Sequence, residues 1–108
     1  MNCRNTVPQL RAWHAKYAAE GFKVIGVHTP EFFWEKSSAR VAAAVKELDI
    51  KYPVVIDNNS EMWNRFGVRA WPTIMLIDRS GKYRYLRIGE GGYETTESWI
   101  RRLLAEKN

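Results

Sequence analysis

The first patterned region covers residues 3–20, where apolar and aromatic side chains recur every three or four positions. This spacing predicts an amphipathic helix that packs one face on a core. Asn5 and Thr6 are candidate N-caps, and Pro8 falls in the first turn, where a missing N–H does no harm. Gly21 is expected to end the helix. The predicted inner stripe consists of Val7, Leu10, His14 and Tyr17, with Trp13 and Ala18 beside it.

The middle of the chain alternates short apolar runs with helical patterns. Residues 22–29 form an uninterrupted, β-branched run, which predicts a strand buried on both faces in a parallel sheet. A second strand is expected at 52–57, and a helix is expected between the two strands at 38–48. A brief helix follows at 60–68, with Ser60 as its N-cap. The predicted inner face of the longer helix consists of Val41, Ala44, Val45 and Leu48.

The last third predicts a β-hairpin followed by a helix. Residues 69–78 are an apolar strand, 79–82 supply a tight turn and 83–90 return as an alternating strand. The closing helix covers 93–106, with Trp99, Ile100, Leu103 and Leu104 facing inward. The resulting order, α-β-α-β-α-β-β-α, indicates an α/β sandwich in which helices cover a mixed sheet.

One expected element is missing from this order. Strand-helix-strand crossovers are the usual way to build such a sheet, yet the first helix has no strand before it. The pattern therefore predicts a fold whose first strand lies outside the sequence. Removal of a central strand exposes apolar edges on both neighbours, so we expect lowered stability or pairing with another copy of the chain.

Composition narrows the possible functions. The 108 residues suit one domain covering 1–108, and 45% apolar with 27% charged residues is typical of a globular protein. The net charge of +5 raises the question of nucleic acid, but acidic residues interleave with the basic ones and no recognition motif accompanies them. The single cysteine and two histidines predict neither an internal disulfide nor a metal site, and no cofactor is indicated. No apolar run has membrane-spanning length, and no signal-peptide pattern precedes the first helix.

The cysteine and several short motifs carry a family resemblance. Cys3 stands at the start of the first predicted helix, Pro8 lies early in that helix, and "GVRAWPT" precedes the hairpin. In this order they resemble the thioredoxin superfamily, within it the TlpA-, ResA- and DsbE-like thiol-disulfide oxidoreductases. The segments "GVHTPEF", "IKYPVVIDN" and "GEGGYETTE" resemble more narrowly the thioredoxin-like domain of DipZ-type cytochrome c biogenesis proteins.

The resemblance implies a fold and a site. The fold is a thioredoxin-like three-layer sandwich with a mixed β-sheet, lacking the strand before the Cys-x-x-Cys helix. Cys3 matches the second, resolving cysteine, so the nucleophilic cysteine would precede Met1 by one residue. Ala70, Trp71 and Pro72 match the substrate-binding loop, with a cis bond before the proline. A bulky Trp71 departs from the small or β-branched residue common at that position, which puts the choice of substrate in question.

Two further residues are candidates for proton transfer. His28 and Glu31 lie at the carboxyl end of a predicted parallel strand, where sites in α/β folds gather. The alternative is a plain strand-end histidine and a glutamate on the approach to a helix.

The resemblance also implies partners and a location: protein thiols or disulfides, a membrane electron donor of the CcdA/DsbD type, and the bacterial periplasm or the extracytoplasmic face of a membrane. Two alternatives remain open from the residues. One is a non-catalytic thioredoxin-like interaction module in which Cys3 is a small, partly buried hydrophobe. The weaker one is a basic nucleic-acid-binding domain.

Overall fold

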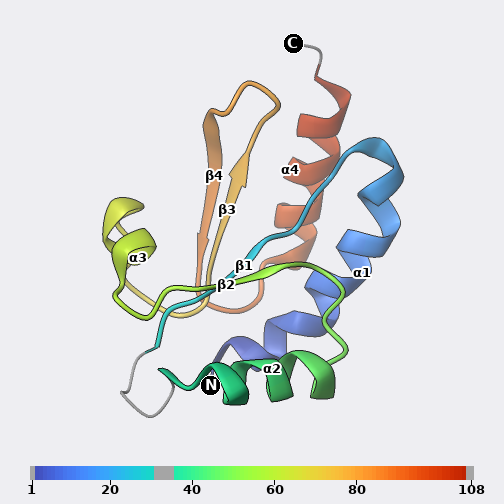
Figure 1. Ribbon diagram of the computed structural model, residues 1–108. Coiled ribbons are helices and arrows are strands. Elements are labelled where there is room, and N and C mark those ends of the chain that lie inside the picture. The colour runs from blue at the N-terminus through green and yellow to red at the C-terminus, as the bar shows by residue number, and fades with distance from the viewer. Residues whose placement is uncertain (1, 31–35, 107–108) are drawn as a thin grey trace.

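The computed structural model describes residues 2–30 and 36–106, with Asn2 and Cys3 described by their main chain. Its elements follow the predicted order (Figure 1). They are η1 (Asn2–Thr6), α1 (Val7–Tyr17), η2 (Ala18–Glu20), β1 (Gly26–His28), α2 (Ser38–Glu47), β2 (Val54–Ile56), α3 (Glu61–Arg65), β3 (Thr73–Ile77), β4 (Tyr83–Ile88) and α4 (Tyr93–Ala105).

The N-terminal helix consists of three pieces rather than one. A 3₁₀ turn, η1, leads into α1, and a second 3₁₀ turn, η2, follows it. The expected side-chain cap was wrong: Thr6 precedes α1 but makes no capping hydrogen bond, and its backbone is already helical (φ −88°, ψ −17°). A capping side chain needs an extended backbone to reach the first free N–H groups. Gly21 ends η2 as predicted, in the left-handed region at φ 94°.

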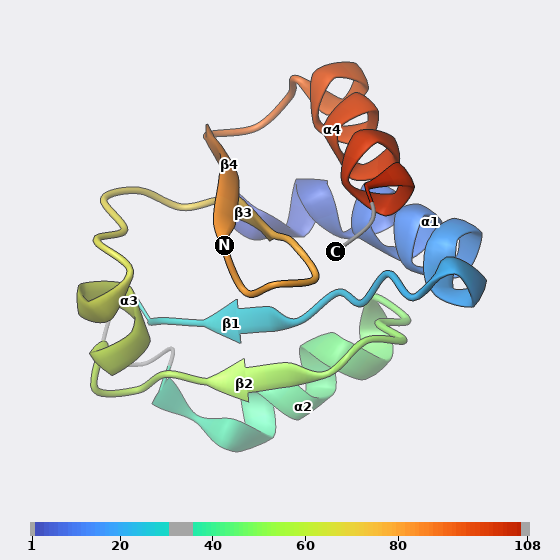
Figure 2. The same cartoon turned by 90° about the horizontal axis from the view of Figure 1, so that it is seen from above.

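The strands form two separate pairs among the described residues, not one mixed sheet. β1 and β2 are parallel, with Val27 opposite Val55. β3 and β4 form the predicted antiparallel hairpin, with Met75 opposite Leu86 and an irregularity near Leu76. α2 lies along the β1–β2 pair, while α1 and α4 lie next to each other beside the hairpin (Figures 1 and 2).

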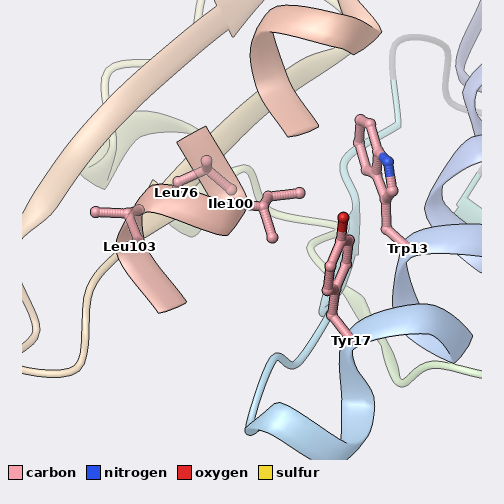
Figure 3. Packing of buried hydrophobic residues seen from close by; sticks show 5 residues of the cluster. All are labelled: Trp13, Tyr17, Leu76, Ile100 and Leu103. Atoms are coloured by element: carbon pink, nitrogen blue, oxygen red, sulfur yellow. The ribbon is translucent and has the colours of Figure 1, made fainter. Parts of the chain in front are cut away.

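The core lies between α1, α4 and the hairpin. Trp13 and Tyr17 from α1 meet Ile100 and Leu103 from α4, and Leu76 of β3 completes the cluster (Figure 3). Trp99 and Leu104 pack partly buried against it, so the inward face predicted for the last helix is confirmed. Burial of these large side chains is the main source of stability in this half of the molecule.

The expectation of a strand at 22–29 buried on both faces was wrong. β1 spans only three residues, and Ile25 and Val27 are 61% and 43% exposed. An uninterrupted apolar run is buried on both faces only where neighbouring strands and helices cover it. Here β2 is the one strand that pairs with β1 among the residues that the structure describes. The edge of β1 away from β2 and the edge of β3 away from β4 therefore carry no strand partner in that part of the chain.

Candidate functional site

The loop that enters β3 holds the residues predicted to bind a substrate chain. The peptide bond between Trp71 and Pro72 is cis, as the sequence motif implied. The hydroxyl of Thr73 donates to the carbonyl of Ala70 at 2.7 Å, which closes the loop across the cis bond. The carbonyl of Pro72 accepts from the N–H of Gly89 at 2.9 Å, which ties the loop to the end of β4. Ala70, Trp71 and Pro72 thus lie on one locally fixed segment.

The Trp71 side chain connects this loop to two other elements. Its indole N–H donates to the main-chain carbonyl of Thr29, just after β1, at 2.8 Å. Its ring packs against Trp63 of α3 with the ring centroids 4.0 Å apart and the planes tilted by 33°. Offset aromatic pairs of this kind contribute roughly 0.5–1.5 kcal/mol beyond the area they bury. The hydrogen bond and the ring contact therefore restrict rotation of the Trp71 side chain.

Asp57, directly after β2, organises the elements around that ring. The carboxylate accepts from the main-chain N–H groups of Met62 and Trp63, each at 3.0 Å, and from the hydroxyl of Thr29 at 2.8 Å. It therefore serves as the N-terminal cap of α3. The prediction that Ser60 caps this helix was wrong: Ser60 is in the left-handed region (φ 58°), and its side chain makes no capping bond.

Burial by itself raises the pKa of Asp57, because a charged carboxylate loses hydration. The hydrogen bonds from Met62, Thr29 and Trp63 outweigh that effect, so the pKa lies below its ordinary value. The group is consequently ionised at neutral pH and acts only as an acceptor.

Cys3 lies in η1, the turn that opens the helical run into α1. In both views this first turn lies close to the segment that leads into β3 (Figures 1 and 2). The Cys3 side chain lies outside the described part, so its catalytic role stays a prediction.

Of the two candidates for proton transfer, the structure describes His28 but not Glu31. His28 is the last residue of β1, and its carbonyl accepts from the N–H of Asp57 at 2.8 Å. Its side chain is half-buried. Glu31 lies outside the described residues. A proton-transfer role for either residue remains a prediction.

Three residues of this site escaped the sequence reasoning: Thr29, Asp57 and Trp63. Asp57 stands at the end of the predicted strand 52–57 and Trp63 lies within the predicted helix 60–68, and neither pattern marks a site. Thr29 and Asp57 share a feature of the sequence that could have revealed them, because each directly follows a parallel strand. The carboxyl ends of parallel strands meet at one edge of a sheet, and α3 lies beyond that edge (Figure 2).

The described residues hold neither a metal-binding cluster nor a membrane-spanning helix. Within residues 2–30 and 36–106, no cluster of three or more histidine, cysteine, aspartate or glutamate side chains is placed to hold a metal ion. In the same ranges, no helix has both the length and the apolar character needed to cross a membrane.

Comparison with known proteins now identifies the family. The family model described as "AhpC/TSA family" matches residues 1–86. The chain belongs to this thioredoxin-like family. The predicted thioredoxin-like fold is supported by a solved structure from Chlorobium tepidum, described as a DsbE-type thiol:disulfide interchange protein. That structure is 26% identical in sequence with a TM-score of 0.87, and the match covers 96% of this chain and 72% of the other.

The curated relatives of this AhpC/TSA family member support the resemblance to ResA-like and DipZ-type proteins. Protein DipZ of Mycobacterium tuberculosis is 41% identical over 96% of this chain, which spans 15% of DipZ. The thiol-disulfide oxidoreductase ResA of Bacillus cereus is 30% identical over 94% of this chain and 56% of its own length. The chain thus spans only part of the curated relatives that it matches.

Proposed function

We propose that this chain is the thioredoxin-like domain, covering residues 1–108, of a thiol-disulfide oxidoreductase. In this proposal Cys3 is the resolving cysteine of a Cys-x-x-Cys motif, whose first cysteine precedes Met1 by one residue in a longer protein. The observation that carries the proposal is the Ala70–Trp71–Pro72 loop, which is tied to the end of β4 and lies close to the turn that holds Cys3 (Figures 1 and 2). The names of ResA and of the DsbE-type structure support the same chemistry.

The proposed reaction transfers two electrons to a substrate disulfide. The first thiolate attacks one sulfur of that disulfide, forms a mixed disulfide and releases the other substrate sulfur as a thiolate. Cys3 then attacks the enzyme sulfur of the mixed disulfide and releases the second substrate thiolate. The enzyme is left with a disulfide between its two cysteines, and the released thiolates take protons from water. A thiol or dithiol donor must then reduce the enzyme for another turnover.

The loop supplies the docking edge in this scheme. Main-chain groups of Ala70 and Trp71 would pair with an extended substrate segment as a short antiparallel strand. The Trp71 ring, held against Trp63, would narrow the groove on one side and restrict which substrate side chains fit. His28 and Glu31 are the candidates for moving protons near the cysteines.

The proposed partners and location rest on the resemblance to the TlpA-, ResA- and DsbE-like proteins. The proposed substrates are protein thiols and disulfides of exported proteins, apocytochrome c among them, as the resemblance to DipZ-type cytochrome c biogenesis proteins implies. The proposed reductant is a membrane electron donor of the CcdA/DsbD type. The proposed location is the bacterial periplasm or the extracytoplasmic face of the membrane.

A disulfide-reduction assay tests the proposal. The chain is extended upstream by its native residues, and reduction of a protein disulfide is measured with a dithiol donor present. We expect activity that Cys3→Ser abolishes after the first exchange, leaving a trapped mixed disulfide that mass spectrometry detects. If the extended protein carries a second cysteine yet stays inert, and Cys3→Ser changes nothing, the oxidoreductase proposal fails.

The second candidate function is a non-catalytic interaction module, with self-association as its simplest form. One observation favours it: large apolar side chains on both strand pairs are exposed, among them Val27, Ile77 and Ile88. The accessible surface is 7324 Å². A folded monomer of this mass is expected to expose about 6,200 Å². The excess, roughly 1,100 Å², is of the order that one partner buries in a stable protein interface. We propose that a second copy covers these strands through the open edges of β1 and β3.

A further inference from the structure

A chain of hydrogen bonds connects the buried carboxylate of Asp57 with the ring of Trp71. Asp57 is 5% exposed and accepts from the Thr29 hydroxyl. The carbonyl of the same Thr29 accepts the indole N–H of Trp71. From its other side Asp57 holds the first N–H groups of α3, which carries Trp63, the stacking partner of Trp71. One carboxylate therefore fixes both groups that hold the indole.

We propose that Asp57 is the positioning residue of the cis-proline loop: through Thr29 and α3 it fixes the Trp71 ring, and with it the docking edge formed by Ala70, Trp71 and Pro72. This proposal rests on the proposed function, because the loop has a substrate to position only if the chain exchanges disulfides. Asp57 itself touches no reacting atom and acts only through its neighbours.

The strength of this arrangement follows from charge and helix length. α3 has five residues, and a helix this short is marginal by itself, so that the packing of its side chains and the cap of its first turn both matter for its stability. Because Ser60 provides no cap, the Asp57 carboxylate is the side chain that satisfies N–H groups at this helix start. An ionised carboxylate near a helix N-terminus is also favoured by the helix dipole. Loss of the charge would loosen α3 and free Trp63 from its stacked position.

The direction of the Thr29 hydroxyl is fixed by the same charge. A carboxylate offers no donor, so the hydroxyl must donate to it, and the Thr29 main chain is anchored beneath the indole N–H. Asp57→Asn puts an amide NH₂ among three donors, so at least one of these bonds is lost. Thr29→Val removes the hydroxyl at nearly constant shape and breaks only the link to β1.

The first test measures the indole pair directly. Near-UV circular dichroism of the chain is recorded for wild type, Asp57→Asn, Thr29→Val and Trp63→Phe, the last giving the spectrum without the stacked pair. The matched control is Asp78→Asn. Asp78 also accepts several hydrogen bonds, from Ser80, Lys82 and Arg84, but lies at the opposite end of β3. We expect Asp57→Asn and Thr29→Val to shift toward the Trp63→Phe spectrum, and Asp78→Asn to retain the wild-type signal.

The second test measures docking at the upstream cysteine, in the upstream-extended chain with Cys3→Ser, where the mixed disulfide stays trapped. The rate at which the upstream cysteine forms that mixed disulfide is compared for a disulfide-linked peptide and for a small aromatic disulfide, dithiobis(nitrobenzoate). Misplacement of a docking edge costs roughly tenfold to a hundredfold in rate. We expect a fall of that size with the peptide for Asp57→Asn and Thr29→Val, and unchanged rates with the small disulfide.

The outcomes separate the two proposals. Unchanged circular dichroism in both variants, or an equal loss of rate with peptide and small disulfide, overturns the positioning role. Thr29→Val decides the matter if Asp57→Asn does not fold. If the extended protein with Asp57 and Thr29 intact never reacts with the peptide while the variants still lose the indole signal, the proposed function fails and the control of Trp71 by Asp57 stands.

Discussion

The indole N–H of Trp71 donates to the carbonyl of Thr29 at 2.8 Å, joining the loop before β3 to the end of β1. At the other end of β3, the guanidinium group of Arg79 donates to the carbonyls of Glu20 (3.5 Å) and Leu104 (3.2 Å). The two strand pairs share no main-chain ladder among the described residues. Trp71 therefore joins the two strand pairs directly, whereas Arg79 joins the hairpin to η2 and α4.

Removal of the Trp71 hydrogen bond should weaken this connection. Trp71→Phe keeps an aromatic ring but loses the N–H, leaving the Thr29 carbonyl without that donor. We expect a loss of about 1 kcal/mol in the free energy of unfolding, measured by urea denaturation. Tyr83→Phe, at an exposed position of β4, is the control and should be neutral. Equal stability of Trp71→Phe and wild type would show that the bond contributes nothing.

Truncation in the core should be far more costly than on the open strands. Ile100 is 2% exposed and contacts the α1–α4–β3 cluster, so Ile100→Ala should destabilise the chain by about 2–5 kcal/mol. Ile77 is 54% exposed, and Ile77→Ala should cost less than about 1 kcal/mol. Thermal melting of both variants provides the comparison. Similar melting temperatures for the two would contradict the assignment of the core.

Acid should remove a stabilising contribution of Glu97. Hydrogen bonds from Tyr17 and Lys16 lower the pKa of this carboxyl to about 2. A group whose pKa is lowered in the folded state stabilises above its unfolded pKa, and loses that contribution as the pH falls through the folded value. Stability should therefore decline between about pH 4.5 and pH 2.

The measurement for Glu97 is urea denaturation as a function of pH. Glu97→Gln should flatten the decline because no proton is then taken up at this position. Glu47→Gln, which removes an exposed carboxylate paired with Arg4, is the matched control and should keep the wild-type slope. An unchanged slope in Glu97→Gln would assign the acid sensitivity to other groups.

The open strand edges should make the chain associate. We expect a concentration-dependent dimer in sedimentation velocity, because β1 and β3 each have an edge without a strand partner in the described part. The double substitution Ile25→Lys and Val27→Lys places charges on β1 and on the residue just before it, and should shift the equilibrium to monomer. Ala43→Lys, on the exposed side of α2, is the control. A monomer of ordinary thermal stability at all concentrations would argue against the vacant edge as an interface.

Periodic features were predictable from the sequence. α1, α2 and α4 follow from apolar spacing, because a helix that covers a core must repeat its apolar side every three or four residues. Gly21 and Gly81 mark turns at positive φ, as their positions suggested. The cis bond before Pro72 came from the family motif, since residue chemistry by itself favours trans.

The remaining features depend on tertiary contacts that no local pattern encodes. Trp63 and Trp71 stack only because α3 and the β3 loop meet beyond the ends of β1 and β2. Asp57, not Ser60, caps α3. The backbone of Ser60 is in the left-handed region, and the Asp57 carboxylate accepts the N–H groups at the start of the helix instead. The burial predicted for residues 22–29 assumed a neighbouring strand on each side, whereas β1 has one strand neighbour, β2, within the described residues.

The division into two strand pairs has a consequence for cooperativity. β3 and β4 share the Leu76–Ile100–Leu103 core, whereas β1 and β2 pair over only three residues. Regions with few buried apolar contacts open locally at lower free energy than the core. Amide hydrogen exchange should therefore divide the chain into two units, with the amides of β1 and β2 exchanging well before those of β3 and β4. The thermally weaker unit is then the one that carries Thr29 and Asp57, so the docking loop would lose its anchor before the core melts.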